Sequence, residues 1–125
     1  MYQGLDLFNT AAAMARHAGA RQALTARNVA NADTPGYEAR VMPTFAQTYG
    51  TSSDFTLRQS DARHMSAQTA HSRQVDLART EPSPNGNTVS IEEEMLNAVA
   101  ISREHNRALT IYRHAMTVLR TTLGR

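Results

Sequence analysis

The C-terminal end of the chain carries a long helical pattern, and this pattern most limits what its 125 residues can fold into. No proline or glycine occurs between Ser90 and Gly124, and apolar or small residues recur there at alternating spacings of four and three. A helix of about 33 residues extends about 50 Å, which is too long for a compact domain of this size. The pattern therefore predicts a coiled-coil helix whose main row comprises Ile91, Met95, Ala98, Ser102, His105, Leu109, Tyr112, Met116, Leu119 and Leu123.

The predicted C-terminal helix has a defined start and a second apolar row. The Ser90 hydroxyl can accept from the Glu93 amide while the Glu93 side chain reaches back, which is a capping box. The carboxylates of Glu92, Glu93 and Glu94 suit the positive end of the helix macrodipole, and this role accounts for them without catalysis. The flanking row consists of Ile101, Ala108, Ile111, Ala115 and Val118.

Residues 4–32 are predicted to form a second long helix that pairs with the first. Alanine is abundant and proline is absent there. Small side chains dominate the apolar rows, so two helices can approach closely although little burial energy is gained per residue. The main row is Leu5, Phe8, Ala12, Ala15, Gly19, Ala26 and Val29, and a second row is Leu7, Ala11, Met14 and Ala18.

A turn follows the N-terminal helix. Pro35 disfavours the α conformation for Thr34, so the helix is expected to end near Asn31 or Ala32. The dipeptide Pro35-Gly36 favours a type II turn, because proline presets one φ and glycine accepts the positive φ that follows.

The central region, residues 36–89, is polar and rich in turn residues. Short strands are predicted at residues 55–57 and 75–77, and the remainder is expected to be irregular, partly extended or mobile. The chain is thus predicted to be mainly α. Its helical segments are residues 1–35 and 90–125, which pair as a coiled coil, and residues 36–89 lie between them.

The number of large apolar residues is low for an independent core. Hydrophobic residues make up 41% of the chain, but 20 of them are alanines. The large ones are concentrated toward the C-terminal segment, so the terminal helices are expected to bury apolar rows against other copies of the chain. Such coupling of folding to assembly predicts weak amide protection in residues 1–35 and 90–125 of an isolated subunit.

The sequence contains no pattern typical of an enzyme or a metal site. There is no cysteine, no close pair of histidine ligands and no phosphate-binding or nucleophile motif. We therefore expect no catalytic residue, cofactor, metal or small-molecule substrate. His105 in the main row is interpreted as a polar position that could fix helix register.

The charge of the chain is only weak evidence for nucleic-acid binding. All 13 basic residues are arginines, yet the formal net charge is only +2. Arginines 103, 107 and 113 are interpreted as a solvated helix face, with Glu104 pairing to Arg107 at a spacing of three. No run of 18 apolar residues predicts a membrane span, and no secretory signal is expected at the N-terminus.

The segment from Ala26 to Tyr37 resembles the signature N-(I/V/L)-A-N-x-x-T-P-G-Y of bacterial flagellar rod and hook proteins. The tail is similar too, with Gly86-Asn87-Thr88-Val89, an acidic run and a heptad helix to the end. The short length leaves no room for large inserted domains, so the chain is most similar to the proximal members of the flagellar basal body rod family. The fixed positions are met by Asn28, Ala30, Asn31, Thr34, Pro35, Gly36 and Tyr37.

This resemblance implies a structural subunit of the rod, the axial drive shaft and export channel that crosses the periplasm. Expected partners are other copies of the chain, the rod proteins FlgC, FlgF and FlgG, the rod-base protein FliE and the MS ring. Export would use the flagellar type III apparatus without a cleaved signal. The resemblance also implies that the motif turn redirects the chain after the first helix, with Asn28 and Asn31, one helical turn apart, bonding to backbone near it. The expected assembly interface comprises Leu5, Phe8, Ala12, Ala15, Met95, Leu109, Tyr112, Met116, Leu119 and Leu123.

Alternatives remain at the level of sequence. The two short proximal rod proteins of the family are hard to separate, because the central residues match only loosely. Outside the family, a small helical-hairpin adaptor that binds a partner helix would share the heptads without needing the turn motif. A nucleic-acid binder would instead show salt-dependent binding to DNA.

Overall fold

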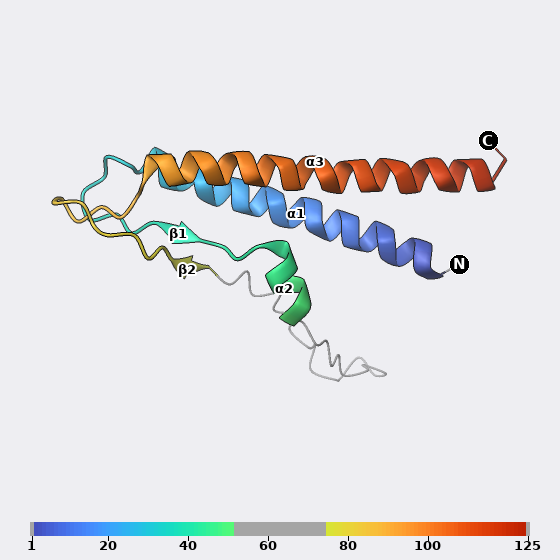
Figure 1. Ribbon diagram of the computed structural model, residues 1–125, viewed down its shortest axis with the longest axis horizontal. Helices are drawn as coiled ribbons and strands as arrows, with labels where there is room; N and C mark the ends of the chain where they lie inside the picture. The colour runs from blue at the N-terminus through green and yellow to red at the C-terminus, as the bar shows by residue number, and fades with distance from the viewer. Residues whose placement is uncertain (1, 52–74, 125) are drawn as a thin grey trace, which may run out of the picture.

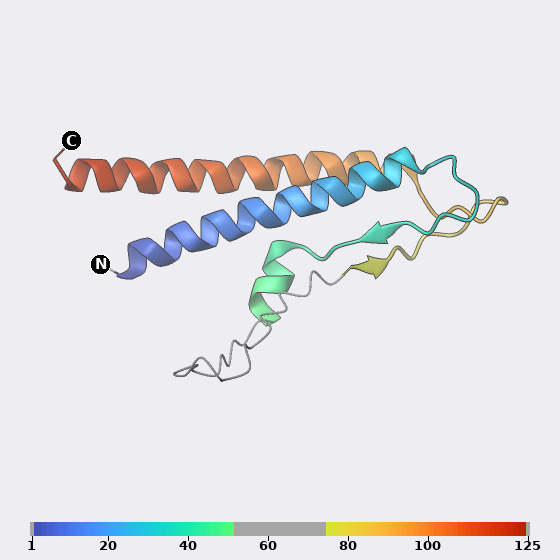
Figure 2. The same ribbon diagram turned by 180° about the vertical axis from the view of Figure 1, so that it is seen from behind.

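Two long helices form an antiparallel hairpin that dominates the structure. The computed structural model describes residues 2–51 and 75–124, with side chains described in 6–49 and 75–124. Helix α1 spans Tyr2–Ala30 and α3 spans Ile91–Thr122. Both chain termini lie at one end of the hairpin, here called the open end, and the helices diverge toward it (Figures 1 and 2). The opposite end, where the loops join the helices, is called the closed end. The mainly α fold is confirmed.

Helix α1 ends where the sequence predicted. Its last helical residue is Ala30, and the amides of Asn31 and Ala32 then bond to the carbonyls of Asn28 and Val29. These tighter i→i−3 bonds satisfy carbonyls that the helix end would leave unpaired. The chain can therefore leave the helix within two residues and enter the turn that contains Pro35.

Helix α3 begins at the predicted cap. The Ser90 side chain accepts a hydrogen bond from the Glu93 amide at 3.4 Å, and Ser90 itself has an extended backbone. At the other end, the Leu123 amide bonds to the Leu119 carbonyl, and Gly124 adopts a positive φ of 73°. Glycine at that position ends the helix without a steric penalty.

The seam between α1 and α3 is built mainly of small residues. On α1, Ala11 and Ala18 are buried, while α3 contributes a row spaced by seven residues. Small side chains let the two backbones approach closely, but the core they make is thin. The seam row of α3 is Glu94, Ile101, Ala108 and Ala115.

The seam differs from the main row read in the sequence. Ile91, Met95 and Leu123 of that row are at least half exposed, whereas Ile101 and Ala108 of the flanking row are almost fully buried. Within the hairpin, α3 therefore packs against α1 through the flanking row and not through the predicted main row. The reason is steric, because the small residues of α1 accept Ala108 and Ala115 more closely than Met or Leu.

A small layer covers one side of the hairpin. Strands β1 (Arg40–Val41) and β2 (Asp76–Leu77) pair antiparallel, with Arg40 opposite Leu77 and Val41 opposite Asp76. Helix α2 (Phe45–Thr51) follows β1 and packs on α1 through an edge-to-face contact between Phe45 and His17. The strand predicted at residues 75–77 is confirmed as β2, and the one predicted at 55–57 lies outside the described residues. In the described part of the chain, no helix is apolar and long enough to cross a membrane.

Candidate functional site

The motif turn at the end of α1 has the predicted geometry. The Tyr37 amide bonds to the Thr34 carbonyl at 3.3 Å, and Gly36 has a φ of 69°. A bond from i+3 to i with positive φ at i+2 is characteristic of a type II turn, so that prediction is confirmed. The turn aims the chain back along the hairpin, where β1 runs beside α1 (Figure 1).

Asn28 holds the returning chain to both helices. Its side-chain amide donates to the Arg40 carbonyl and to a Glu94 carboxylate oxygen, both at 2.8 Å. Its oxygen accepts from the Arg40 amide at 3.2 Å and from the Tyr37 hydroxyl at 3.3 Å. The side chain is 1% exposed, so all four of its hydrogen-bonding positions are satisfied away from water.

Asn87 performs a similar role from the second loop. Its amide nitrogen lies 2.8 to 2.9 Å from the carbonyl oxygens of Asn31, Ala32 and Thr34, which belong to the motif turn. Its own oxygen accepts from the Val89 amide at 2.7 Å. One buried side chain therefore ties residues 31–34 to the segment that leads into α3. We call Asn28, Asn87 and Glu94 the closed-end cluster.

The two loops also touch through their backbones. The Gly36 amide donates to the Asn85 carbonyl at 3.0 Å, and the Thr88 amide donates to the Tyr37 carbonyl at 3.0 Å. Gly36 and Gly86 face each other, since a Cβ added at Gly86 would lie 3.5 Å from the Gly36 Cα. Both have positive φ, so glycine serves the conformation of each turn as well as their contact.

Sequence reasoning placed Asn28 and Asn31 correctly but missed their partners. The Asn31 side-chain nitrogen donates to the Arg27 carbonyl, and Asn28 bonds to the backbone of β1, as expected for both. Glu94, however, was assigned only to the helix dipole, and Asn87 was noted only as part of a similar tail. The signal for Glu94 was its place seven residues before Ile101 in the flanking row, which predicts burial.

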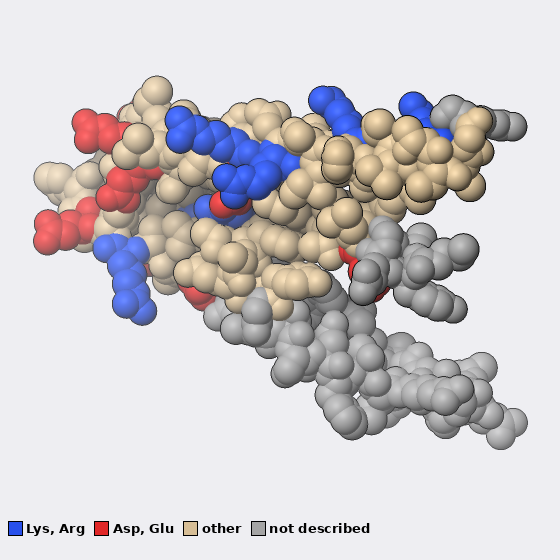
Figure 3. Space-filling model, turned by 45° about the vertical axis from the view of Figure 1, so that its right-hand side comes forward, with Lys and Arg blue, Asp and Glu red and all other residues tan. Residues whose placement is uncertain are grey.

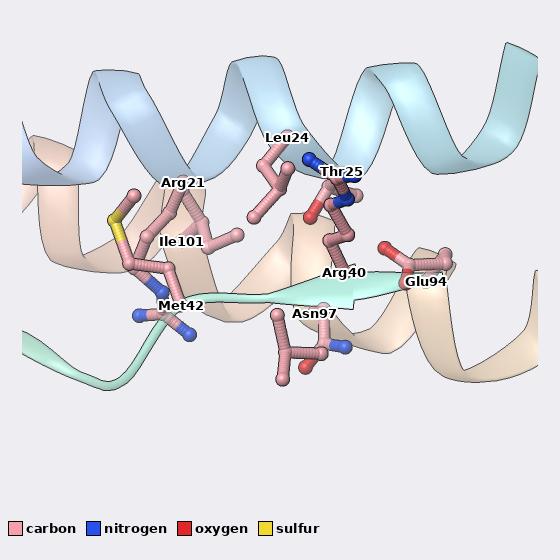
Figure 4. Close-up of a pocket in the computed structure, with 9 residues that line it drawn as sticks. Arg21, Leu24, Thr25, Arg40, Met42, Glu94, Asn97 and Ile101 are labelled. Atoms are coloured by element: carbon pink, nitrogen blue, oxygen red, sulfur yellow. The ribbon is translucent and has the colours of Figure 1, made fainter. Parts of the chain in front are cut away.

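A hollow of about 110 Å³ lies beside the closed-end cluster, between the helices and β1. Figure 4 shows Arg21 and Thr25 of α1, Arg40 of β1 and Glu94 of α3 around it. At its edge Arg21 forms an ion pair with Glu104 of α3 at 2.7 Å, with the two side chains 12% and 25% exposed. The pairing of Glu104 with Arg107 was therefore wrong: the acid bridges the hairpin instead.

At the open end, the predicted interface residues gather around a second hollow. Phe8 and Tyr112 meet edge to face with ring centroids 5.3 Å apart. A groove of about 380 Å³ lies between the diverging helices beside this pair. We call it the open-end groove; its lining residues are Phe8, Asn9, Ala12, Tyr112, Met116 and Leu119.

The other predicted interface residues lie elsewhere on the hairpin. Ala15 and Leu109 are half-buried, whereas Met95 is 63% exposed near the closed end and Leu123 is 77% exposed at the open end. Leu5 belongs to the first turns of α1, but its side chain lies outside the described part of the structure. The structure therefore brings together five of the ten residues, namely Phe8, Ala12, Tyr112, Met116 and Leu119.

The histidines do not form a cluster. Within the described residues, no group of three His, Asp or Glu side chains could hold a metal ion. His17 packs against Phe45, and the Nδ1 atom of His105 is buried without a hydrogen-bond partner. His64 and His71 lie outside the described residues.

Comparisons with known proteins identify the family. No family model matches the chain. Among curated proteins it is similar to the flagellar basal body rod protein FlgB of Yersinia ruckeri, with 34% identity over 73% of this chain and 74% of the relative. FlgB of Salmonella typhimurium is 32% identical over 73% of each chain. FlgB of Cereibacter sphaeroides is 31% identical over 82% of each. The chain therefore belongs to the FlgB family of flagellar basal body rod proteins.

Proposed function

We propose that the chain is a structural subunit of the proximal flagellar rod and that it polymerises helically through one side of its α1·α3 hairpin. The single observation that supports this best is that the main heptad row of α3 is only partly covered within the hairpin. Its two ends are exposed, with Ile91 and Met95 at one end and Leu119 and Leu123 at the other between 41% and 77% exposed. Regularly spaced apolar side chains that one chain leaves exposed are typical of a surface that another protein covers.

The row lies on the side of the hairpin that the small layer leaves free. Thr10 and His17 of α1 face α2, through the Tyr49 hydroxyl and the Phe45 ring. Ala12 and Ala15 are each two residues away from one of them, a rotation of about 200° on a helix. The layer of β1, β2 and α2 therefore covers one flank, and the open-end groove opens on the other.

The free side supplies what the thin seam lacks. The buried apolar residues of the described chain are five alanines and Ile101, whereas many large apolar side chains are a third or more exposed. Burying one such side chain contributes about 1.5 to 3 kcal/mol. Packing of neighbouring hairpins would thus offset the conformational entropy that ordering the long helices costs.

The proposed assembly sets the partners and the location. The neighbours would be other copies of the chain, the rod proteins FlgC, FlgF and FlgG, the rod-base protein FliE and the MS ring. The subunit would pass through the flagellar type III export apparatus without a cleaved signal and would act in the part of the rod that crosses the periplasm. The role is structural, so no catalytic residue or cofactor is assigned.

Leu119→Asp tests the proposal. Leu119 is 41% exposed and lines the open-end groove, so a carboxylate there would lie unpaired in the buried contact with a neighbour. We expect loss of swimming and of rods in purified basal bodies, with normal amounts of subunit in the cell. Thr117→Asp is the matched control, because it places the same charge two residues away and about 200° around the helix. Motile cells with Leu119→Asp would refute the proposal.

A further inference from the structure

The hairpin has an acidic end and a basic end. In the third of the hairpin nearest the closed end, with the loops and the small layer, residues 23–51 and 76–100 hold seven acids and three arginines. In the other two thirds, residues 2–22 and 101–124 hold six arginines and two acids. Figure 3 shows the carboxylates gathered mainly toward the closed end and arginines along α3 toward the termini. The charges of the described residues thus form an electric dipole along the long axis of the hairpin.

The helix macrodipole explains only part of this separation. Glu92 and Glu93 in the first turn and Arg120 in the last turn of α3 are placed as the helix dipole favours. That effect falls off within one turn of a helix end, so it does not account for Arg107 or Arg113 within α3. Exposed acids of the loops, such as Glu38 and Glu81, also lie outside any helix. The helix dipole therefore leaves the rest of the charge separation unexplained.

Each charged end also carries an apolar surface. At the closed end, Ile91, Met95, Leu96 and Val99 of α3 are 50%, 63%, 73% and 52% exposed, directly beside Glu92 and Glu93. We call these four residues the closed-end patch. At the other end, the exposed Arg113 and Arg120 directly follow the groove residues Tyr112 and Leu119 along α3. An exposed apolar patch with acidic neighbours thus matches an apolar groove with basic neighbours.

We propose that the closed-end patch of one copy docks into the open-end groove of the next copy, with the acidic neighbours of the patch against the basic neighbours of the groove. This inference rests on the proposed rod function and names the contact through which copies join. The two surfaces differ and lie at opposite ends of the hairpin, so the contact is heterologous. Heterologous contacts whose rotation does not close generate open helical polymers, which is the form a rod requires. Charge complementarity between these neighbours fixes the direction in which copies add.

Cysteine cross-linking tests the contact in assembled rods. The chain contains no cysteine, so two single variants, Leu96→Cys and Asn9→Cys, can be produced together as full-length copies in one cell. Leu96 belongs to the closed-end patch, and Asn9 is an exposed residue of the open-end groove. We expect a disulfide between the two kinds of copy in purified basal bodies, because a disulfide requires Cα atoms within about 7 Å.

The controls separate direction from mere proximity. A two-fold contact would join two Leu96→Cys copies or two Asn9→Cys copies, whereas the proposed contact leaves each variant alone without product. Thr110→Cys lies on an exposed part of α3 outside both surfaces and should not couple to Leu96→Cys. Where the cysteine variants impair assembly in the cell, the purified full-length copies can be mixed and oxidised instead. The same pattern of cross-links is then expected.

Charge reversal supplies the second test. Arg113→Glu on the Asn9→Cys copy should lower the yield of the cross-link at least about tenfold, because like charges would face each other across the contact. Glu92→Arg on the Leu96→Cys copy should restore it. The inference would be overturned if Leu96→Cys cross-linked equally well to Thr110→Cys and to Asn9→Cys. It would also be overturned if the cross-link yield did not respond to charge reversal. If the predicted cross-link fails but Leu119→Asp still abolishes rods, the docking contact is wrong and the proposed rod function stands.

Discussion

The two ends of the hairpin are held by different physics. At the closed end, Asn28 and Asn87 are almost fully buried and donate to groups of α3, β1 and the motif turn. At the open end, the helices diverge around a groove, with the Phe8–Tyr112 ring contact beside it. Directional hydrogen bonds between buried groups therefore fix the subunit's own fold at the closed end. At the open end the described contacts within the subunit are apolar, and the proposed contact with a neighbour would cover the groove.

The largest loss is expected from Asn28→Asp. The new carboxylate would face the Glu94 carboxylate and the Arg40 carbonyl, to which Asn28 now donates at 2.8 Å. An uncompensated buried charge of this kind costs about 4 kcal/mol, so the free energy of unfolding of the purified subunit should fall by about that amount. Urea unfolding followed by circular dichroism measures it. Asn106→Asp, an exposed change on α3, is the control, and equal losses for both variants would break the comparison.

Asn87→Ala should have the next largest effect. It removes the donor to three carbonyls of residues 31–34 and the acceptor for the Val89 amide. Unpaired buried groups cost about 1 to 3 kcal/mol each, and partial access of water limits the expected total to about 3 kcal/mol. Asn87→Asp would place a buried carboxylate oxygen against the same three carbonyl oxygens, so it should lose more stability than Asn87→Ala. If Asn87→Ala lowers the free energy of unfolding no more than the same substitution at an exposed asparagine, the role of the closed-end cluster is contradicted.

The sequence predicted much of the fold because its signals were local. The cap at Ser90, the end of α1 and the type II turn at Pro35-Gly36 each depend on neighbouring residues, and each is confirmed. The choice of seam row was not local. It depends on which face of α3 the small residues of α1 admit, and no count of spacings within α3 contains that information.

The candidate site was predicted only in part for the same reason. The bond from Asn28 to Glu94 joins residues 66 positions apart, and the bonds from Asn87 to the motif turn span 53 to 56 positions. One sequence gives no pairing signal at such distances. The gathering of Phe8, Ala12, Tyr112, Met116 and Leu119 was reachable, because antiparallel pairing of the two terminal helices brings the start of one beside the end of the other.

Two glycine substitutions should have smaller and opposite effects. Gly36 in the motif turn has a φ of 69°, so Gly36→Ala should destabilise the subunit by about 1 kcal/mol through backbone strain. Gly19 lies within α1, and a Cβ there would meet nothing within 4 Å. Gly19→Ala should therefore stabilise the subunit by about 1 kcal/mol through helix propensity. Thermal unfolding of both variants checks the pair, and effects of the same sign would contradict it.

The smallest effect on the free subunit is expected at the open end. Leu119→Asp replaces a side chain that is 41% exposed, so it should lower the free energy of unfolding by no more than about 1 kcal/mol even though it is expected to abolish rods. The same urea experiment as for Asn28→Asp measures this. A loss of several kcal/mol would show that the open-end groove belongs to the subunit's own core.

Amide hydrogen exchange on the free subunit and on assembled rods tests the separation of the two ends most directly. In the free subunit, the amides of Gly36, Arg40 and Thr88, which are bonded within the closed end, should be the better protected. The helical amides near Phe8 and Met116 should exchange faster and gain at least about tenfold protection in the rod. Strong, equal protection of both ends in the free subunit, with no gain on assembly, would contradict the account.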